Sequence, residues 1–315
     1  MKSKKSSTAK RTVFVLGAGF TRAFIDKAVL LTDHHEIHHL IKKYPKDQYP
    51  YAHEILELEA ERQKANQGRL DIERLMTRLD GYMPHDYERR STKELELLYR
   101  DIKRDFTDKL KELIGTEPVP PEMFAFAKWC IQNSAHCITF NYDDFLDQAL
   151  WKVEGNPNDS LLSRKYWHPN SGYGFFCRPA NTCVGTEPSV MGRSTILLLK
   201  LHGSINWRLK LGASRPCSID SIVHFQKWYP PEYESMLPQY NRDAINDHLE
   251  PVSFIELPIL LKKALTKEPI FRRVWSEAFK RLLAAEKVVF IGYSMPRTDI
   301  ATGFLLSEAL RIQRI

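Results

Sequence analysis

Two residues suited to chemistry, His202 and Asn141, each directly follow a short apolar run. An imidazole exchanges a proton near neutral pH and can act as a general acid or base. An asparagine amide offers both a donor and an acceptor to a sugar hydroxyl or a water molecule. Asp143, two residues beyond Asn141, can fix a neighbouring group or accept a hydrogen bond from a ribose. Taken singly, these residues also fit a turn and a buried, hydrogen-bonded histidine.

A glycine-rich segment follows the first apolar run of the chain. Its residues are Gly17, Ala18, Gly19, Phe20 and Thr21. Glycines let a backbone approach a phosphate closely, a helix N-terminus favours negative charge, and Thr21 adds a hydroxyl donor. The full dinucleotide fingerprint has a third glycine where this chain has Arg22. The segment therefore predicts either a nucleotide site or a tight strand-to-helix turn.

Further small and polar residues follow the third and fourth apolar runs. They are Gly203, Ser204, Gly292, Ser294 and Asp299. At Gly203 the missing side chain would let a substrate approach the backbone, and the Ser294 hydroxyl could bond a ribose or a phosphate. Asp299 has two interpretations, as a ligand contact or as the cap of a following helix. We include all five as candidate cofactor-binding residues.

The four apolar runs predict the strands of one sheet, at residues 12–16, 137–140, 195–201 and 288–291. Continuous apolar runs are typical of parallel strands that are buried on both faces. Ligands bind beyond the carboxyl ends of such strands, so four strands that each end in special residues indicate a single cleft. Helical patterns at residues 144–152 and 272–286 alternate with the strands. We therefore expect an α/β fold, a Rossmann-like parallel sheet with a helical insertion subdomain.

The domain organisation follows from changes in composition. Residues 1–11 form a basic tail that we expect to be disordered, and residues 12–315 form one nucleotide-binding domain. Within it, residues 34–133 have few strand signals and read as a helical insertion between the first two strands. Residues 155–194 and 208–251 are rich in Pro, Asn, Ser and Gly and are expected to be long loops.

Composition narrows the class of protein. No apolar run approaches the roughly 20 residues of a membrane span, and the N-terminus lacks the apolar stretch of a signal peptide. We therefore expect a cytoplasmic protein without membrane contact. The net charge is +7, but the tail supplies five of these charges, so the rest of the chain carries only +2. A nucleic-acid role for the tail stays open beside a role in solubility.

Metal and disulfide chemistry find little support in the sequence. The five cysteines include no C-x-x-C pair, which argues against a disulfide framework and a zinc ribbon. His35, Glu36 and His39 do match H-E-x-x-H, the zinc protease motif. A third ligand is not evident nearby, and the segment is polar, so a surface helix is the better interpretation. We expect no metal.

The four segments, in this order, resemble the sirtuin-like family. The resemblance rests on Gly17 to Thr21, Thr139 to Asp143, Leu201 to Ser204 and Gly292 to Ser294. It extends over about residues 12–310 and is closer to the bacterial branch found in antiphage defence than to the histone deacylases. The four-cysteine zinc module of the deacylases has no counterpart here, which argues against protein deacylation. Relatives also continue beyond the point where this chain ends, so we expect a fragment or a shortened member.

The resemblance implies a role for each segment. Gly17, Ala18, Gly19 and Thr21 would bind the phosphates of NAD, with Thr21 in place of the usual serine. Asn141 would hold the nicotinamide ribose or the attacking water, Asp143 would support the site, and His202 would be the catalytic histidine. Ser294 would contact the adenosine side of the cofactor.

The expected function is therefore NAD hydrolysis to ADP-ribose and nicotinamide, with NAD as substrate and antiphage defence by NAD depletion as its role. Because unrestrained NAD cleavage is toxic, we expect gating by homo-oligomerisation or by a defence-system partner. Two alternatives remain. One is an NAD-dependent protein deacylase or ADP-ribosyltransferase, and the other is a non-enzymatic sensor of NAD or ADP-ribose.

Overall fold

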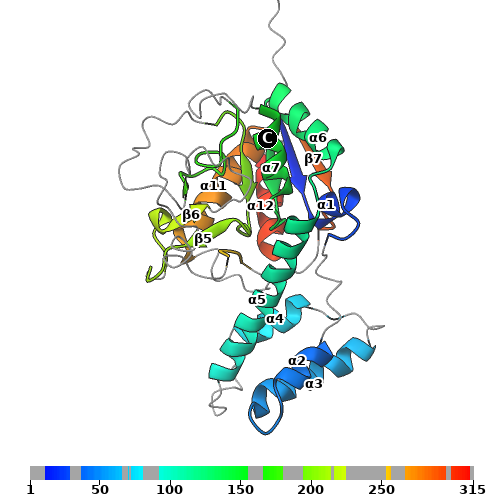
Figure 1. Ribbon diagram of the computed structural model, residues 1–315. Helices are drawn as coiled ribbons and strands as arrows, with labels where there is room; N and C mark the ends of the chain where they lie inside the picture. The colour runs from blue at the N-terminus through cyan, green and yellow to red at the C-terminus, as the bar shows by residue number, and fades with distance from the viewer. Residues whose placement is uncertain are drawn as a thin grey trace, which may run out of the picture.

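The computed structural model describes residues 11–28, 37–65, 70, 72–80, 92–154, 166–179, 194–213, 216–224, 253–256, 267–295 and 299–312. Figure 1 shows a sheet-containing body and a group of helices that extends from it. The predicted tail lies outside the described residues, apart from Arg11. No helix in the described part of the chain is long and apolar enough to cross a lipid bilayer.

The central sheet has four parallel strands in the order β4-β2-β1-β7. They are β1 (Thr12–Leu16), β2 (His136–Thr139), β4 (Leu198–Lys200) and β7 (Lys287–Ile291). The predicted α/β, Rossmann-like parallel sheet is therefore confirmed. The third strand is shorter than predicted, but its backbone hydrogen bonding continues past its end, because Leu201 donates to the Thr139 carbonyl at 3.0 Å. From β1 the strand order runs through β2 to β4 on one side, while β7 is added on the other side of β1. The direction in which strands are added therefore reverses beside β1.

Among the described residues, five helices belong to the sheet-containing body, where α6 packs against α7 and α11 packs against α12 and β4. They are α1 (Ala18–Phe24), α6 (Pro121–Gln132), α7 (Phe145–Glu154), α11 (Pro269–Leu283) and α12 (Ile300–Ile312). The apolar stripe of α11 is buried as expected, at Val274, Ala278 and Leu282. This helix begins three residues earlier than predicted, because Pro269 occupies its first turn, where a missing N–H costs nothing.

The segment between β1 and β2 is helical throughout its described parts. It contains α2 (Ile37–Lys43), α3 (Pro50–Ala65), α4 (Ile72–Asp80) and α5 (Thr92–Thr116), followed by α6. Helices α2 to α5 share a hydrophobic cluster of their own, and Figure 1 shows them below the sheet-containing body. Helix α6 instead buries Met123, Ala127 and Cys130 in the cluster that surrounds the sheet. The boundaries of the insertion, 34–133, stay a prediction.

A second, smaller sheet falls, apart from Trp207, inside the two segments that we predicted to be long loops, 155–194 and 208–251. It has the order β3-β6-β5, with β3 (Arg178–Pro179), β5 (Trp207–Leu209) and β6 (Ile222–His224). A 3-10 turn, Ile219–Ser221, precedes β6. Strands of two or three residues are too short to give an alternating pattern, so they could not be predicted from the sequence. The Trp207 ring packs edge-on against Tyr173 and Phe175 and anchors this sheet to the main core.

The ends of β1 and β7 interlock through three glycines. Gly17 and Gly19 donate their backbone N–H groups to the carbonyls of Ile291 and Gly292, each at 3.0 Å. Gly292 has a φ of +62°, and a Cβ atom there would lie 2.1 Å from the backbone nitrogen of Phe20. The tight strand-to-helix turn considered for this segment is thus present, and it brings the two strand ends into direct contact.

Replacing Gly292 with alanine is expected to lower the free energy of unfolding by about 2–5 kcal/mol, through left-handed strain and a backbone clash. Gly212 offers a matched control, because its φ is +75° but a Cβ atom there would meet nothing within 4 Å. Gly212→Ala is therefore expected to cost only about 1 kcal/mol. Urea unfolding of both variants measures the difference, and equal losses would show that the contact with α1 is unimportant.

Candidate functional site

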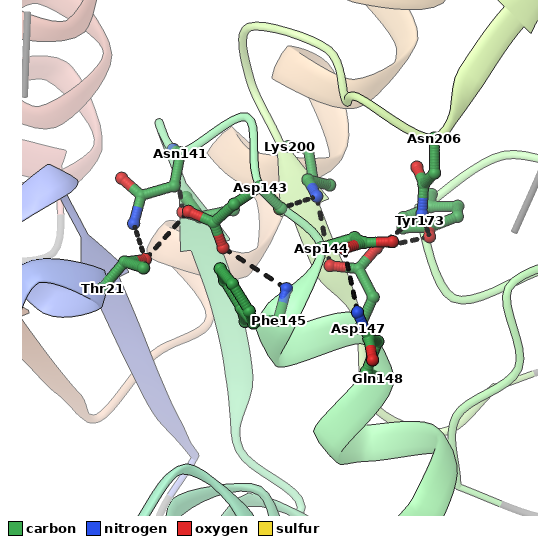
Figure 2. Close-up of polar contacts among 11 residues, drawn as sticks. Thr21, Asn141, Asp143, Asp144, Phe145, Asp147, Gln148, Tyr173, Lys200 and Asn206 are labelled. Atoms are coloured by element: carbon green, nitrogen blue, oxygen red, sulfur yellow. Dashed lines mark hydrogen bonds and ion pairs between the residues drawn. The ribbon is translucent and has the colours of Figure 1, made fainter. Parts of the chain in front are cut away.

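The ends of β1, β2 and β4 bring the predicted site residues to one edge of the sheet. Strands β2 and β4 pair Thr139 with Lys200, so Asn141 and His202 each lie two residues beyond that pair. Thr21, in the first helix after β1, contacts both Asn141 and Asp143. Figure 2 shows this hydrogen-bonded group and a second polar group beside it. The convergence expected from the sequence is present for these residues.

Thr21, Asn141 and Asp143 form a hydrogen-bond chain with a defined direction. The Thr21 hydroxyl donates to Asp143 Oδ2 at 2.9 Å, so its oxygen is free to accept. Asn141 Nδ2 donates to that oxygen, also at 2.9 Å. Because a carboxylate only accepts, an ionised Asp143 fixes the orientation of the Thr21 hydroxyl and of the Asn141 amide. The backbone N–H of Asn141 donates to Thr139 Oγ1 at 3.1 Å and holds the residue in place.

These hydrogen bonds leave the carbonyl oxygen of the Asn141 side chain without a partner among the described residues. The residue is only 9% exposed, and its Oδ1 is buried with no hydrogen bond to any described residue. A buried acceptor that stays unsatisfied costs about 1–3 kcal/mol. Such an atom at a sheet edge, in an amide oriented by Thr21, is suited to accept a hydrogen bond from a hydroxyl or a water molecule.

The Asp143 carboxyl is subject to opposing influences. Burial raises its pKa above the ordinary value, whereas the Lys200 ammonium and the hydrogen bond from Thr21 lower it. The Asp147 carboxylate adds a smaller upward influence on the pKa, and a hydrogen bond from the Phe145 backbone a downward one. Lys200 and Thr21 therefore favour the ionised form of Asp143. The direction of the hydrogen bonds from Asn141 through Thr21 to Asp143 depends on that form.

His202 lies in an aromatic environment. Its ring is 5.4 Å from that of Phe140, 6.2 Å from Tyr142 and 6.4 Å from Trp275, measured between centroids. Trp275 also donates its indole N–H to the Leu201 carbonyl at 2.9 Å. The histidine is buried, so strand end and ring contacts together hold the imidazole at the same sheet edge as Asn141.

The residues after His202 are held by a backbone segment, 253–256. Gly203 has a φ of +85°, and a Cβ atom there would lie 2.3 Å from the Phe254 carbonyl oxygen. Glu256 donates its N–H to the His202 carbonyl at 2.8 Å, and Ser204 donates to Phe254 at 3.2 Å. The backbone of residues 253–256 thus approaches Gly203 closely, and the predicted contact of Gly203 with a substrate or cofactor stays a prediction. Ser204 is fully buried, and its hydroxyl has no hydrogen bond within the part of the chain that the structure describes.

Other predicted contact residues have structural roles. The Phe20 ring is buried and packs on Phe24 and Phe126, so only its backbone remains near the edge. The amides of Gly17 and Gly19 are engaged with β7, as described above, while Ala18 is exposed. The phosphate-binding roles inferred for this segment stay predictions.

Of the two interpretations of Asp299, the structure contains the helix cap. Its carboxylate accepts from the backbone N–H and the hydroxyl of Thr302 in the first turn of α12, at 3.4 and 2.7 Å. Tyr293 also donates to it at 3.0 Å, and the Tyr293 ring stacks on Phe140. Ser294, between these residues, is exposed, and its contact with the adenosine side stays a prediction.

A buried polar group beneath the site was missed by the sequence reasoning. Lys200 Nζ donates to the Asp143 carbonyl at 2.6 Å and to Asp147 Oδ2 at 3.1 Å. Tyr173 and Asn206 donate to the other oxygen of Asp147 (Figure 2). A signal was present, because Lys200 interrupts an otherwise apolar strand, and a lysine is almost never buried without a partner.

Metal-binding groups are not evident in the described residues, where no three His, Cys, Asp or Glu side chains gather as a metal site would require. His35 and Glu36 of the H-E-x-x-H motif lie outside the described residues, and His39 is exposed on α2. The four cysteines in the described part of the chain, Cys130, Cys137, Cys177 and Cys217, are buried.

Comparison with protein families identifies the relatives of the chain. The family model described as a SIR2-like domain matches residues 135–312, which is more than half of the chain. The chain belongs to the SIR2-like family. Members of this family act on NAD, and the matched region contains the ends of β2, β4 and β7 with Asn141 and His202. No protein with a curated description matches the chain.

Proposed function

We propose that this SIR2-like protein is an NAD hydrolase, which cleaves the nicotinamide–ribose bond of NAD and releases nicotinamide and ADP-ribose. The observation that carries the proposal is the Oδ1 atom of Asn141, which is buried at the sheet edge, oriented by the bond to Thr21 and without a partner among the described residues. An acceptor of this kind fits a ribose hydroxyl or the attacking water, both of which are donors. His202, level with Asn141 on the neighbouring strand, supplies a group that can take a proton.

The chemistry assigns a separate task to each residue. The bond between the ribose C1 and the nicotinamide nitrogen breaks with its electron pair leaving on nicotinamide, so positive charge develops on the ribose. Asn141 Oδ1 orients the water or the ribose, which places the nucleophile on one face of the sugar. The water oxygen then bonds to C1, and His202 accepts the proton that the water releases. Thr21 and Asp143 orient the Asn141 amide and do not react.

The cellular role that we propose is NAD depletion in antiphage defence, in the cytoplasm. This role rests on the resemblance of the four strand-end segments to the bacterial defence branch of the family. Free NAD cleavage would harm the cell, so the activity is proposed to be gated by homo-oligomerisation or by a partner protein that responds to infection.

Nicotinamide release from NAD by the purified protein tests this proposal. The assay runs with the protein alone, with lysate of phage-infected bacteria, and with an acylated peptide as acceptor. Release without the peptide, before or after addition of the lysate, supports a hydrolase. Release only with the peptide would instead indicate a deacylase or an ADP-ribosyltransferase. Tight NAD binding without release under any condition would indicate a sensor.

A further inference from the structure

The ammonium group of Lys200 and the carboxylate of Asp147 form an ion pair that is removed from solvent. Their side chains are 0% and 1% exposed, and the two atoms lie 3.1 Å apart. Moving two charges out of water is unfavourable unless further hydrogen bonds satisfy them. Here Tyr173 and Asn206 both donate to the second oxygen of Asp147. Burial and the neighbouring Asp147 carboxylate raise the pKa of the Tyr173 phenol, so its hydroxyl remains a donor.

The second hydrogen bond of Lys200 connects this buried pair to the candidate site. Lys200 Nζ donates to the backbone carbonyl of Asp143 at 2.6 Å. Lys200 is the last residue of β4 and lies two residues before His202, while Asp143 lies two residues after Asn141. One side chain therefore ties the turn after β2 to the strand that carries the histidine.

We propose that Lys200 is a positioning residue, which holds the turn at residues 141–144 and fixes the direction of the hydrogen bonds from Asn141 through Thr21 to Asp143. This inference rests on the proposed function, since it concerns how Asn141 presents its acceptor atom to NAD or water. Lys200 contacts no substrate and acts only through Asp143.

The electrostatic reason lies in the charged groups around the Asp143 carboxyl. Among the described residues, these are the Lys200 ammonium from β4 and the Asp147 carboxylate from α7, while α1 supplies the uncharged Thr21 hydroxyl. Burial raises the pKa of Asp143, and Lys200 is the strongest influence that opposes it. If Asp143 were protonated, it would donate to Thr21, and Thr21 would donate onward to Asn141. The Asn141 amide would then turn its NH₂ group outward and present a donor where the reaction needs an acceptor.

Two variants isolate the contribution of Lys200. Lys200→Met alone leaves Asp147 buried without its counter-charge and is expected to unfold. Asp147→Asn is expected to fold, because Lys200 keeps its hydrogen bond to the Asp143 carbonyl and the attraction of the Asp143 carboxylate. The test therefore compares Asp147→Asn with the double variant Lys200→Met/Asp147→Asn. Both keep an oxygen at position 147 for Tyr173 and Asn206, and they differ only at Lys200. Far-UV circular dichroism and thermal melting establish that both variants fold.

Two readouts are measured as a function of pH. The first is nicotinamide release from NAD, whose acid limb is expected to move to higher pH by about 1 unit in the double variant relative to Asp147→Asn. The second is the carboxyl resonance of Asp143 in protein labelled with ¹³C-aspartate, assigned by its loss in Asp143→Asn. Its midpoint is expected to rise by a similar amount.

The two readouts separate failure of this inference from failure of the proposed function. A rise in the Asp143 midpoint without nicotinamide release from any variant would support the role of Lys200 and contradict NAD hydrolysis. Nicotinamide release with unchanged midpoints in the matched pair would overturn the role of Lys200 and leave NAD hydrolysis standing.

Discussion

Asn141→Ala is expected to lower the rate of nicotinamide release from NAD by about 10²–10³-fold, a loss comparable to removal of one preorganised transition-state contact. The variant removes the buried Oδ1 atom that we assign to the ribose or the water. It also leaves the Thr21 oxygen without its donor, while the bond from Thr21 to Asp143 can persist. The fold is expected to survive, because the backbone bonds of the sheet do not involve this side chain.

Steady-state kinetics over a range of NAD concentrations measures the effect. A fall in kcat with little change in KM would indicate that Asn141 acts mainly in the transition state. Asn133→Ala is the matched control, because Asn133 only donates to the Trp129 carbonyl at the end of α6. Full activity in Asn141→Ala would remove Asn141 from the mechanism.

Replacing His202 with phenylalanine is expected to lower nicotinamide release by about 10²–10⁴-fold, the usual contribution of a general acid or base. The imidazole is surrounded by Phe140, Tyr142 and Trp275, so it also contributes to packing. Phenylalanine preserves an aromatic ring at this position but cannot accept a proton. The variant therefore separates chemistry from packing, which alanine alone would not do.

The comparison of His202→Phe with His202→Ala decides between these roles. If His202 takes a proton, both variants lose activity to a similar extent, although His202→Ala also melts at a lower temperature. If the ring only fills space, His202→Phe should recover most of the activity that His202→Ala loses. His39→Ala on the exposed face of α2 serves as the control for loss of a histidine.

The sheet and the convergence of its strand ends could be predicted because both follow from local patterns. Buried parallel strands give continuous apolar runs, and polar residues directly after them must meet at one edge. The contacts of Thr21 with Asn141 and Asp143 bridge more than a hundred residues, yet they follow from this rule. The antiphage branch and the NAD-binding roles of individual residues depend on resemblance and stay predictions.

Features that depend on tertiary contacts were beyond the reach of the sequence. The sequence could not show that Gly203 packs against the backbone of residues 253–256, which is distant in sequence, and its role in cofactor binding stays a prediction. The sequence left two roles open for Asp299; its bonds to Thr302 show the helix cap, and the ligand contact stays a prediction. Lys200 was visible as a charge in an apolar strand, but its partner Asp147 could only be found in three dimensions.

The helical segment between β1 and β2 also reaches the site, which the sequence did not indicate. Tyr142, the residue between Asn141 and Asp143, belongs to the hydrophobic cluster of helices α2 to α5 and packs edge-on against Phe106 of α5. Its hydroxyl donates to the Glu256 carbonyl at 2.8 Å. The position of the turn after β2 therefore depends on packing against helices α2 to α5, which lie outside the sheet-containing body.

The most direct test of NAD hydrolysis follows the oxygen atom of water into the product. NAD is incubated with the protein in H₂¹⁸O, together with infected-cell lysate if the protein alone is silent, and ADP-ribose is analysed by mass spectrometry after rapid quenching. Unlabelled ADP-ribose treated in the same way corrects for exchange with solvent. We predict that ¹⁸O enters ADP-ribose in step with nicotinamide release and that Asn141→Ala suppresses both. Nicotinamide release without labelled ADP-ribose, or no release under either condition, would contradict the assignment of this site to NAD hydrolysis.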